Sequence, residues 1–293
     1  MSGMLKYQFP GEDLFVSGHT ACPGCGEAQA VRFILRALGE KTILVVPPSC
    51  IAIIVGPQPL SSMKVPVYQP AFETSAVAAA AISRALKAKG QDDVTVVALA
   101  GDGGTYDIGF QALSAAAERN EDIIYICLDN EGYMNTGVQK SSATPSGAWT
   151  TSTPLGKSQP KKNLVEIMAA HGIPYTATAT VGYPDDLVRK VQKAKGIRGM
   201  RFIEVLTPCI SGWGIEDHVS VPLSRLAVES KIFPLYEIED GERYTLNKQP
   251  RGLPVSAYLE KQKRYAHLTG EHVGKIQRKV DKNWERLAVR LQQ

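Results

Sequence analysis

Short apolar runs alternate with segments of helical character along most of this chain. Apolar, β-branched runs of strand length lie at 42–46, 94–100, 122–128, 175–180 and 202–206. Segments with the spacing or composition of helices lie beside them, at 26–39, 75–89, 109–119, 163–171 and 185–195. Strands that alternate with helices predict a doubly wound, mostly parallel α/β sheet, because parallel strands need a crossover between them.

Two segments depart from this alternation. Residues 130–160 are polar and lack clear periodicity, and a loop of this length in a compact domain usually carries function. Near the C-terminus, apolar residues recur at helical spacing: Ile276, Val280, Trp284, Leu287 and Leu291. This stripe predicts a helix that packs on the domain or on a partner. We therefore expect an α/β domain at residues 1–230 and a helical extension at residues 231–293.

The composition is that of an ordinary globular protein, with 44% hydrophobic and 21% charged residues. The net charge of +4 is too small to indicate a nucleic-acid partner. Residues 231–293 hold 13 Lys and Arg against 8 Asp and Glu, so the positive charge is concentrated in the extension. A basic extension could steer an acidic protein partner, or it could simply be a solvated helix face.

No segment has the pattern of a targeting signal or of a membrane helix. Met1–Pro10 is neither basic nor apolar enough for a signal peptide, and prolines and a glycine interrupt the apolar stretch 42–60. The five cysteines are an odd number, which suggests reduced thiols or metal ligands rather than disulfides. The chain is therefore expected to be cytoplasmic, with no membrane partner.

A glycine-rich motif follows the apolar run at 94–100. Gly101-Asp102-Gly103-Gly104 comes directly after this run, and Asp129-Asn130 ends the next predicted strand. Adjacent parallel strands end side by side, so Asp102 and Asn130 can converge on one Mg²⁺ ion, which prefers oxygen ligands. The glycines would let the backbone approach a diphosphate at a helix N-terminus, whereas glycines alone could simply make a turn. The combination resembles the thiamine diphosphate motif.

Four of the five cysteines form a two-plus-one-plus-one set: Cys22, Cys25, Cys50 and Cys209. Four thiolates could hold an iron–sulfur cluster or a structural zinc ion, and the C-x-x-C pair at a helix start could also be a redox dithiol. The residues alone leave these three alternatives open. Cys127 lies inside an apolar run and is expected in the core.

Four longer segments carry a resemblance to a known family. They are 19–27 (HTACPGCGE), 131–137 (EGYMNTG), 141–149 (SSATPSGAW) and 207–213 (TPCISGW). Together with the glycine-rich motif, they resemble the β subunit of pyruvate:ferredoxin oxidoreductase and related 2-oxoacid:ferredoxin oxidoreductases over nearly the whole chain. The resemblance implies a thiamine-diphosphate-binding fold, with a [4Fe–4S] cluster near the thiazolium ring on Cys22, Cys25, Cys50 and Cys209.

The same resemblance implies how thiamine diphosphate is held. Mg²⁺ would be bound by Asp102, Asn130 and the carbonyl of Gly132. Phe72 matches a family residue near the thiazolium ring and Asn135 one beside the reacting carbon, so these two are the candidate catalytic residues. The expected cofactor-binding residues are Cys50, Phe72, Gly101, Asp102, Gly103, Gly104, Asn130, Gly132, Asn135 and Thr136. For Phe72, Asn135 and Thr136, ordinary packing or turn formation is the alternative.

The implied activity is oxidative decarboxylation of a 2-oxoacid such as pyruvate, as in anaerobic metabolism. Electrons would pass through the cluster to ferredoxin, and coenzyme A would take up the acyl group. The family's catalytic glutamate comes from an α subunit, and its further clusters belong to a ferredoxin-like subunit or domain. This chain has no ferredoxin-like run of cysteines, so we expect a dimer of heteromeric units.

The substrate and two rival functions stay open. Pro47-Pro48-Ser49 before the third cysteine and the aliphatic run 51–55 differ from pyruvate-type relatives, so a branched 2-oxoacid or an oxalate-like diacid used without coenzyme A is an alternative. A non-oxidative thiamine diphosphate decarboxylase subunit would not need four spaced cysteines. A zinc-binding partner module would not need the diphosphate motif.

Overall fold

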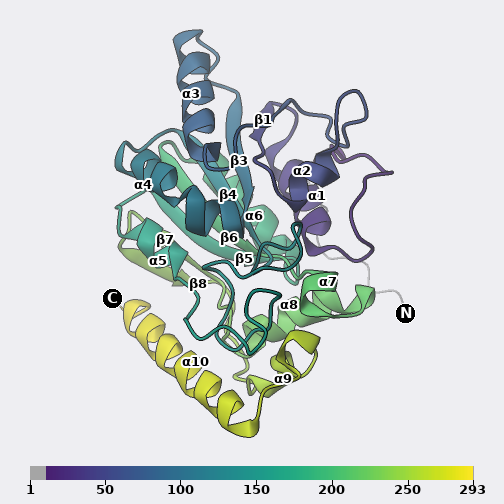
Figure 1. Cartoon of the computed structure of the whole chain (residues 1–293). Helices are drawn as coiled ribbons and strands as arrows, with labels where there is room; N and C mark the ends of the chain where they lie inside the picture. The colour runs from purple at the N-terminus through teal and green to yellow at the C-terminus, as the bar shows by residue number, and fades with distance from the viewer. Residues whose placement is uncertain (1–10, 293) are drawn as a thin grey trace, which may run out of the picture.

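An eight-stranded sheet forms the centre of the computed structural model, which describes residues 11–292 (Figure 1). The strand order is β2-β1-β3-β4-β6-β5-β7-β8. The strands are β1 (Thr42–Val45), β2 (Val67–Tyr68), β3 (Thr95–Gly101), β4 (Ile123–Asp129), β5 (Tyr175–Thr180), β6 (Met200–Leu206), β7 (Tyr236–Glu239) and β8 (Arg243–Leu246). The first six strands in this order are parallel, and β7 and β8 are added antiparallel. This confirms the predicted mostly parallel α/β sheet, whereas the expectation about Met1–Pro10 lies outside the described residues.

Helices cover both faces of this sheet (Figure 1). The α-helices are α1 (Gly26–Leu38), α2 (Cys50–Val55), α3 (Ser75–Ala88), α4 (Phe110–Glu118), α5 (Leu164–Ala169), α6 (Pro184–Gly196), α7 (Ile210–Trp213), α8 (Ser220–Glu229), α9 (Ser256–Leu259) and α10 (Gly270–Arg290). A π-helical turn, η1 (Gly104–Ile108), precedes α4, and two short 3₁₀ turns are η2 (Asp217–Val219) and η3 (Lys263–Tyr265). All five helices predicted between the strands are present.

Side chains of β4 alternate between two apolar cores, as expected for a strand that is covered on both faces. Ile124 and Ile126 belong to the core that contains α1 and α6. Tyr125 and Cys127 belong to the opposite core, which contains α3, α4 and α5. Cys127 is fully buried, so its predicted place in the core is confirmed.

The first helix shows why the predicted pattern folds as it does. Val31, Ile34, Leu35 and Leu38 recur at helical spacing in α1, and all four are completely buried against the sheet. Burying each of these aliphatic side chains contributes roughly 1.5–3 kcal/mol. Gly39 follows with a φ of 79°, a backbone conformation that favours glycine, and the helix ends there.

Residues 231–293 contribute strands as well as a helix. β7 and β8 extend the sheet beyond β5, and neither strand was predicted. The predicted C-terminal helix is α10, which buries Leu287 against the second core. A domain boundary at residue 230 stays a prediction.

Among the helices between residues 11 and 292, none combines the length and the apolar character that crossing a bilayer requires.

Candidate functional site

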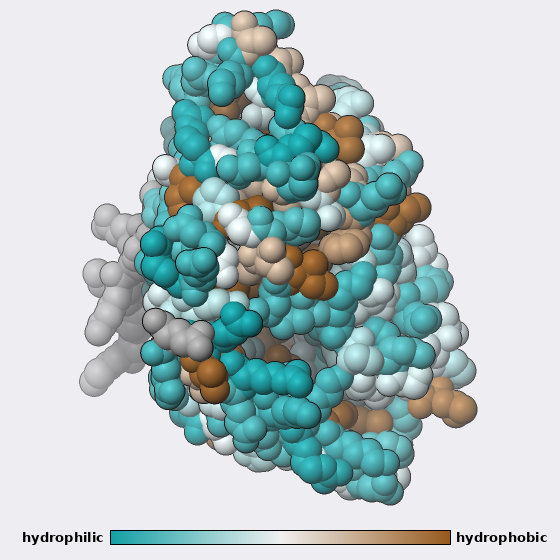
Figure 2. Space-filling model, turned by 90° about the vertical axis from the view of Figure 1, so that its left-hand side faces the viewer, coloured by the Kyte–Doolittle hydropathy of each residue, from teal (hydrophilic) through white to brown (hydrophobic). Residues whose placement is uncertain are grey.

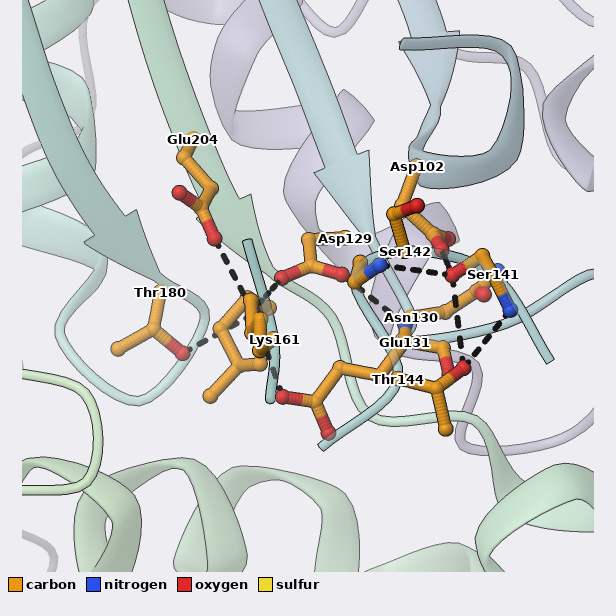
Figure 3. Close-up of polar contacts among 12 residues, drawn as sticks. Asp102, Asp129, Asn130, Glu131, Ser141, Ser142, Thr144, Lys161, Thr180 and Glu204 are labelled. Atoms are coloured by element: carbon orange, nitrogen blue, oxygen red, sulfur yellow. Dashed lines mark hydrogen bonds and ion pairs between the residues drawn. The ribbon is translucent and has the colours of Figure 1, made fainter. Parts of the chain in front are cut away.

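The two polar side chains expected to share a metal ion follow neighbouring strands. Asp102 comes directly after β3 and Asn130 directly after β4, and the register pairs Gly101 with Leu128. Parallel pairing therefore brings both residues to the same edge of the sheet (Figure 3). Both are buried, with 1% of Asp102 and 5% of Asn130 exposed.

One oxygen of each of these side chains has no hydrogen-bond partner. Asp102 accepts a hydrogen bond from Ser141 Oγ through Oδ2, at 2.5 Å, but its Oδ1 is buried and unpaired. Asn130 donates through Nδ2 to Glu27 Oε1, at 2.6 Å, and its Oδ1 is likewise unpaired. A buried acceptor without a partner costs roughly 1–3 kcal/mol. A divalent cation with oxygen ligands would satisfy both oxygens, so the residues present fit Mg²⁺.

The electrostatic environment of Asp102 also fits a cation. Burial, together with the nearby Asp129 carboxylate, raises the pKa of Asp102 well above its usual value. The hydroxyl of Ser141 and the backbone N–H of Gly132 oppose this shift only in part. An isolated Asp102 therefore resists ionisation, and a bound cation would stabilise its charged form. The contact with Asp102 is made by the backbone N–H of Gly132, so the role of its carbonyl as a metal ligand stays a prediction.

The glycines of the motif allow aromatic rings to approach the backbone closely. A Cβ at Gly103 would lie 2.3 Å from Tyr133 Cε1, so only glycine fits there. A Cβ at Gly104 would lie 3.1 Å from Phe72 Cε2, which places Phe72 directly beside the motif. Phe72 and Tyr133 are also a tilted aromatic pair, with ring centroids 6.3 Å apart.

The loop beyond Asn130 holds the remaining predicted cofactor residues. Asn135 and Thr136 are exposed, and the role of Asn135 beside the reacting carbon and that of Thr136 in cofactor binding stay predictions. Thr136 exchanges hydrogen bonds with Gln139, with Thr136 Oγ1 to Gln139 Oε1 at 2.6 Å and Gln139 Nε2 to the Thr136 carbonyl at 3.0 Å. These contacts are those of a turn, the alternative considered for Thr136.

A buried network of charges anchors this loop behind the site. Lys161 forms ion pairs with Asp129, with Glu131 at 3.4 Å and with Glu204 at 3.1 Å (Figure 3). Burial alone would lower the pKa of Lys161, but the three carboxylates outweigh it and raise that pKa. The charged Lys161 thus holds the end of β4, the loop and β6 together.

The C-terminal extension also supports the Asn130 loop. Arg264, nearly fully buried, forms an ion pair with Glu131 at 2.6 Å and stacks over the Trp213 ring at 3.8 Å from its centroid. Trp213 Nε1 in turn donates to the Asn130 carbonyl at 2.8 Å. Glu131 adopts a φ of 65°, an unfavourable value for a non-glycine residue. These contacts hold the left-handed turn that orients Asn130.

The predicted cluster cysteines come from three segments that the fold brings together. Gly26 N–H donates to the Pro208 carbonyl at 3.3 Å, which joins the segment of Cys25 to that of Cys209. A Cβ at Gly101 would lie 3.6 Å from Ser49 Cβ, which places the start of α2 beside the glycine-rich motif. The cysteines in these segments therefore lie next to the Asp102 side of the site.

The four thiols interact electrostatically. Burial and the Glu27 carboxylate raise the pKa of Cys25 to about 12, and Cys209 contributes to this shift. Burial also raises the pKa of Cys50, with contributions from Glu27, Cys209 and Cys25. Burial raises the pKa of Cys209 as well, and Cys22 contributes. These mutual contributions indicate that the four thiols lie near one another, and their role as cluster ligands stays a prediction.

Between residues 11 and 292, no three His, Cys, Asp or Glu side chains are arranged around a single point where one metal ion could sit. The predicted ligands of Mg²⁺ and of the iron–sulfur cluster therefore stay predictions.

Glu27 is a site residue that the sequence analysis missed. It is 3% exposed, its Oε1 accepts the hydrogen bond from Asn130, and its Oε2 is buried without a partner. Burial raises the pKa of Glu27 to about 7. The sequence could have indicated this residue, because Glu27 lies one turn before Val31 and is a carboxylate on the otherwise apolar stripe of α1. Nothing in the sequence around Ser141, in contrast, indicated its contact with Asp102.

Comparisons with known proteins show which family this chain resembles. Residues 68–205 match the family described as "Thiamine pyrophosphate enzyme, C-terminal TPP binding domain". The chain is 48% identical to pyruvate synthase subunit PorB of Methanothermobacter thermautotrophicus, over 96% of this chain and 100% of that protein. It is 46% identical to ketoisovalerate oxidoreductase subunit VorB of Pyrococcus furiosus, over 96% of this chain and 94% of that protein.

A solved structure shares the fold at lower identity. The 2-oxoglutarate:ferredoxin oxidoreductase from Magnetococcus marinus superposes with a TM-score of 0.58 and 20% sequence identity. The match covers 72% of this chain and 79% of that chain. At this identity the likeness supports the fold of the sheet and its flanking helices.

Proposed function

Because this chain belongs to the family of β subunits of 2-oxoacid:ferredoxin oxidoreductases, we propose that it binds Mg²⁺, thiamine diphosphate and one [4Fe–4S] cluster. In this role it catalyses oxidative decarboxylation of a 2-oxoacid and passes the electrons through its cluster to ferredoxin. The observation that carries the proposal is the pair of unpaired, buried oxygens on Asp102 and Asn130 at adjacent strand ends. A turn with a purely structural role would not require unpaired oxygens on these two side chains.

Thiamine diphosphate, when bound, supplies the carbon nucleophile and the electron sink for decarboxylation. Asp102, Asn130 and the carbonyl of Gly132 hold the metal that neutralises its diphosphate. Phe72, against Gly104, forms an apolar wall at the motif, and Asn135 contacts the reacting region. Cys22, Cys25, Cys50 and Cys209 hold the cluster. The charge of Asp102 contributes to raising the pKa of Cys50, which supports a short path between cofactor and cluster.

The active assembly contains other subunits, as the subunit names of the relatives imply. An α subunit supplies the glutamate that activates the cofactor. Two glutamates of this chain are unsuited to that role, since Glu73 is exposed and Glu131 is engaged by Arg264 and Lys161. A ferredoxin-like subunit or domain carries the electrons onward, in a cytoplasmic dimer of heteromers.

Pyruvate and a branched 2-oxoacid are the leading substrates, and coenzyme A is the acyl acceptor. Two relatives of nearly equal identity support this pair, because one is named for pyruvate and the other for ketoisovalerate. An oxalate-like diacid, which needs no coenzyme A, is the third candidate.

The test is an anaerobic assay of the assembled complex with a panel of 2-oxoacids, with and without coenzyme A, and with viologen or ferredoxin as acceptor. We expect reduction that requires coenzyme A and is fastest with pyruvate or ketoisovalerate. Parallel analysis of iron, sulfide, magnesium and thiamine should find all four. Decarboxylation without acceptor reduction or iron would show a non-oxidative decarboxylase, and zinc without thiamine would show a binding module.

A further inference from the structure

A second cavity lies away from the predicted cofactor residues, beneath α10. Its volume is about 670 Å³, within the range of sites for small molecules. It is enclosed by α10, by residues 231–236 and by the loop around Lys161. Figure 2 looks onto the side of the molecule where the chain ends, and hydrophilic side chains there surround a recess. None of the residues predicted to hold thiamine diphosphate or the cluster lines this cavity.

The walls of the cavity are largely apolar and aromatic. Phe233, Tyr236 and Tyr258 line it from the body of the domain, and Val280 and Trp284 line it from α10. The three body residues are buried, with 1% to 7% exposed. Such walls favour a ligand with an apolar body.

Four cationic side chains line the same cavity near the surface: Lys231, Lys279, Arg286 and Arg290. None of the four forms an ion pair with any residue between 11 and 292. Lys231 lies over the Trp284 ring, 5.2 Å from its centroid. Partial desolvation lowers the pKa of Lys279, since no carboxylate opposes it.

The acids that line the cavity are already engaged by other groups. Glu131 and Glu204 pair with Lys161, and Glu166 accepts a hydrogen bond from Tyr244 Oη at 2.7 Å. The cavity therefore presents uncompensated positive charge.

We propose that this cavity binds a small organic anion. The apolar body of the ligand lies among the aromatic walls, and a carboxylate or phosphate pairs with the cations at the mouth. The site goes beyond the proposed function, because its ligand is not the cofactor and it lies behind Glu131 and Lys161, away from the Asp102 side.

The test is calorimetric titration of the purified full-length chain with octanoate and with octyl phosphate. At least one of them should bind, and whichever binds more tightly identifies the preferred head group. Octylamine, which has the same body with a positive charge, should not bind, and inorganic phosphate should bind at least about tenfold more weakly. Equal binding of octylamine and octanoate would overturn the proposal.

Variants locate the binding. The double change Lys231→Gln and Lys279→Gln should weaken octanoate binding at least about tenfold, since it removes two of the cations that pair with the head group. Val280→Trp should block the cavity without changing charge. Lys282→Gln is the matched control, because Lys282 is an exposed cation of α10 outside the cavity. Equal weakening in the control would show a general charge effect and refute the site.

The same titration of the assembled complex should give the same order of affinities, and loss of binding on assembly would refute a role in the working enzyme.

Discussion

Two buried polar clusters of this chain serve different purposes. Lys190, on α6, is completely buried, and its ammonium donates to the Thr178 carbonyl at 2.7 Å and to Asp186 at 2.6 Å. At the carboxyl end of the sheet, Asp102 and Asn130 are equally buried but each keeps an unpaired oxygen. In the first cluster the buried ammonium is satisfied by partners within the chain. In the second, the two unpaired oxygens would be satisfied only by a bound ligand.

The comparison shows how a ligand site can be told from a structural charge. Burial by itself does not distinguish them, because both clusters are buried and both contain groups with shifted pKa values. Two unpaired acceptors at adjacent strand ends do distinguish them, because few buried acceptors stay unsatisfied and these two lie at the same edge of the sheet. Glu27, with its own unpaired oxygen beside Asn130, belongs with the second cluster.

Asp102→Ala should have the largest effect. It removes the only carboxylate among the predicted metal ligands, so the affinity of the assembled complex for Mg²⁺ and thiamine diphosphate should fall at least about 100-fold. The measurement is calorimetric titration after the bound cofactor has been removed with a chelator. Asp186→Asn, in the structural cluster, is the control and should leave this affinity unchanged. Retained affinity in the Asp102 variant would mean that the unpaired oxygen serves no metal.

Cys209→Ser should abolish the cluster and spare the other cofactor. After anaerobic reconstitution of the purified chain, iron and sulfide should fall to background, because a four-thiolate site loses one ligand. Cys127→Ser changes a buried cysteine of β4 that is not a predicted ligand, and it should keep its iron. Full iron content in the Cys209 variant would contradict the assignment of that thiolate.

Arg264→Met should have a smaller effect on the same titration. It removes the ion pair with Glu131 and the cation over Trp213, so the Asn130 loop loses support while every metal ligand remains. Loss of such an outer contact typically weakens metal binding 10- to 100-fold. Arg264→Lys, which keeps the charge, should recover part of the affinity. An unchanged affinity in Arg264→Met would show that the loop is held by its other contacts.

Lys190→Met should leave cofactor binding untouched and change only the pH dependence of stability. Burial lowers the pKa of Lys190 to about 8, although Asp186 opposes the shift. Above this pH the native state releases the proton while the unfolded chain keeps it until about pH 10.5. Relative to the variant, the wild-type free energy of unfolding should therefore rise by roughly 3 kcal/mol between pH 8 and pH 10.5. Urea unfolding at several pH values measures this difference, and a constant difference would refute the shifted pKa.

Features that are set by residues close together in the sequence could be predicted from the sequence. The alternation of apolar runs and helices predicted the sheet, and the motif after β3 predicted that Asp102 would meet Asn130. The four-residue elements α7, α9, β7 and β8 were missed, whereas β1, which is equally short, was predicted from its β-branched and aliphatic residues. The ten-residue helix α8 was missed as well.

Contacts between distant segments left no local trace. Arg264 and Glu131 are 133 residues apart, and nothing in either segment indicates their ion pair. Ser141 reaches Asp102 across 39 residues through a loop without periodicity. Glu27 is the exception, because a carboxylate on the apolar stripe of α1 is visible in the sequence itself. The Arg264–Glu131 and Ser141–Asp102 contacts can be recognised only in the folded structure, where the sheet brings the distant segments together.

The short helix α7 has a mechanical consequence. The thiol of Cys209 accepts the Gly212 N–H at one end of it, and the indole of Trp213 reaches the Asn130 carbonyl from the other. If Cys209 and Asn130 hold the cluster and the metal as proposed, this one turn of backbone and its hydrogen bond to Asn130 would join the two sites. Their separation would then depend on contacts within this chain rather than on the neighbouring subunits.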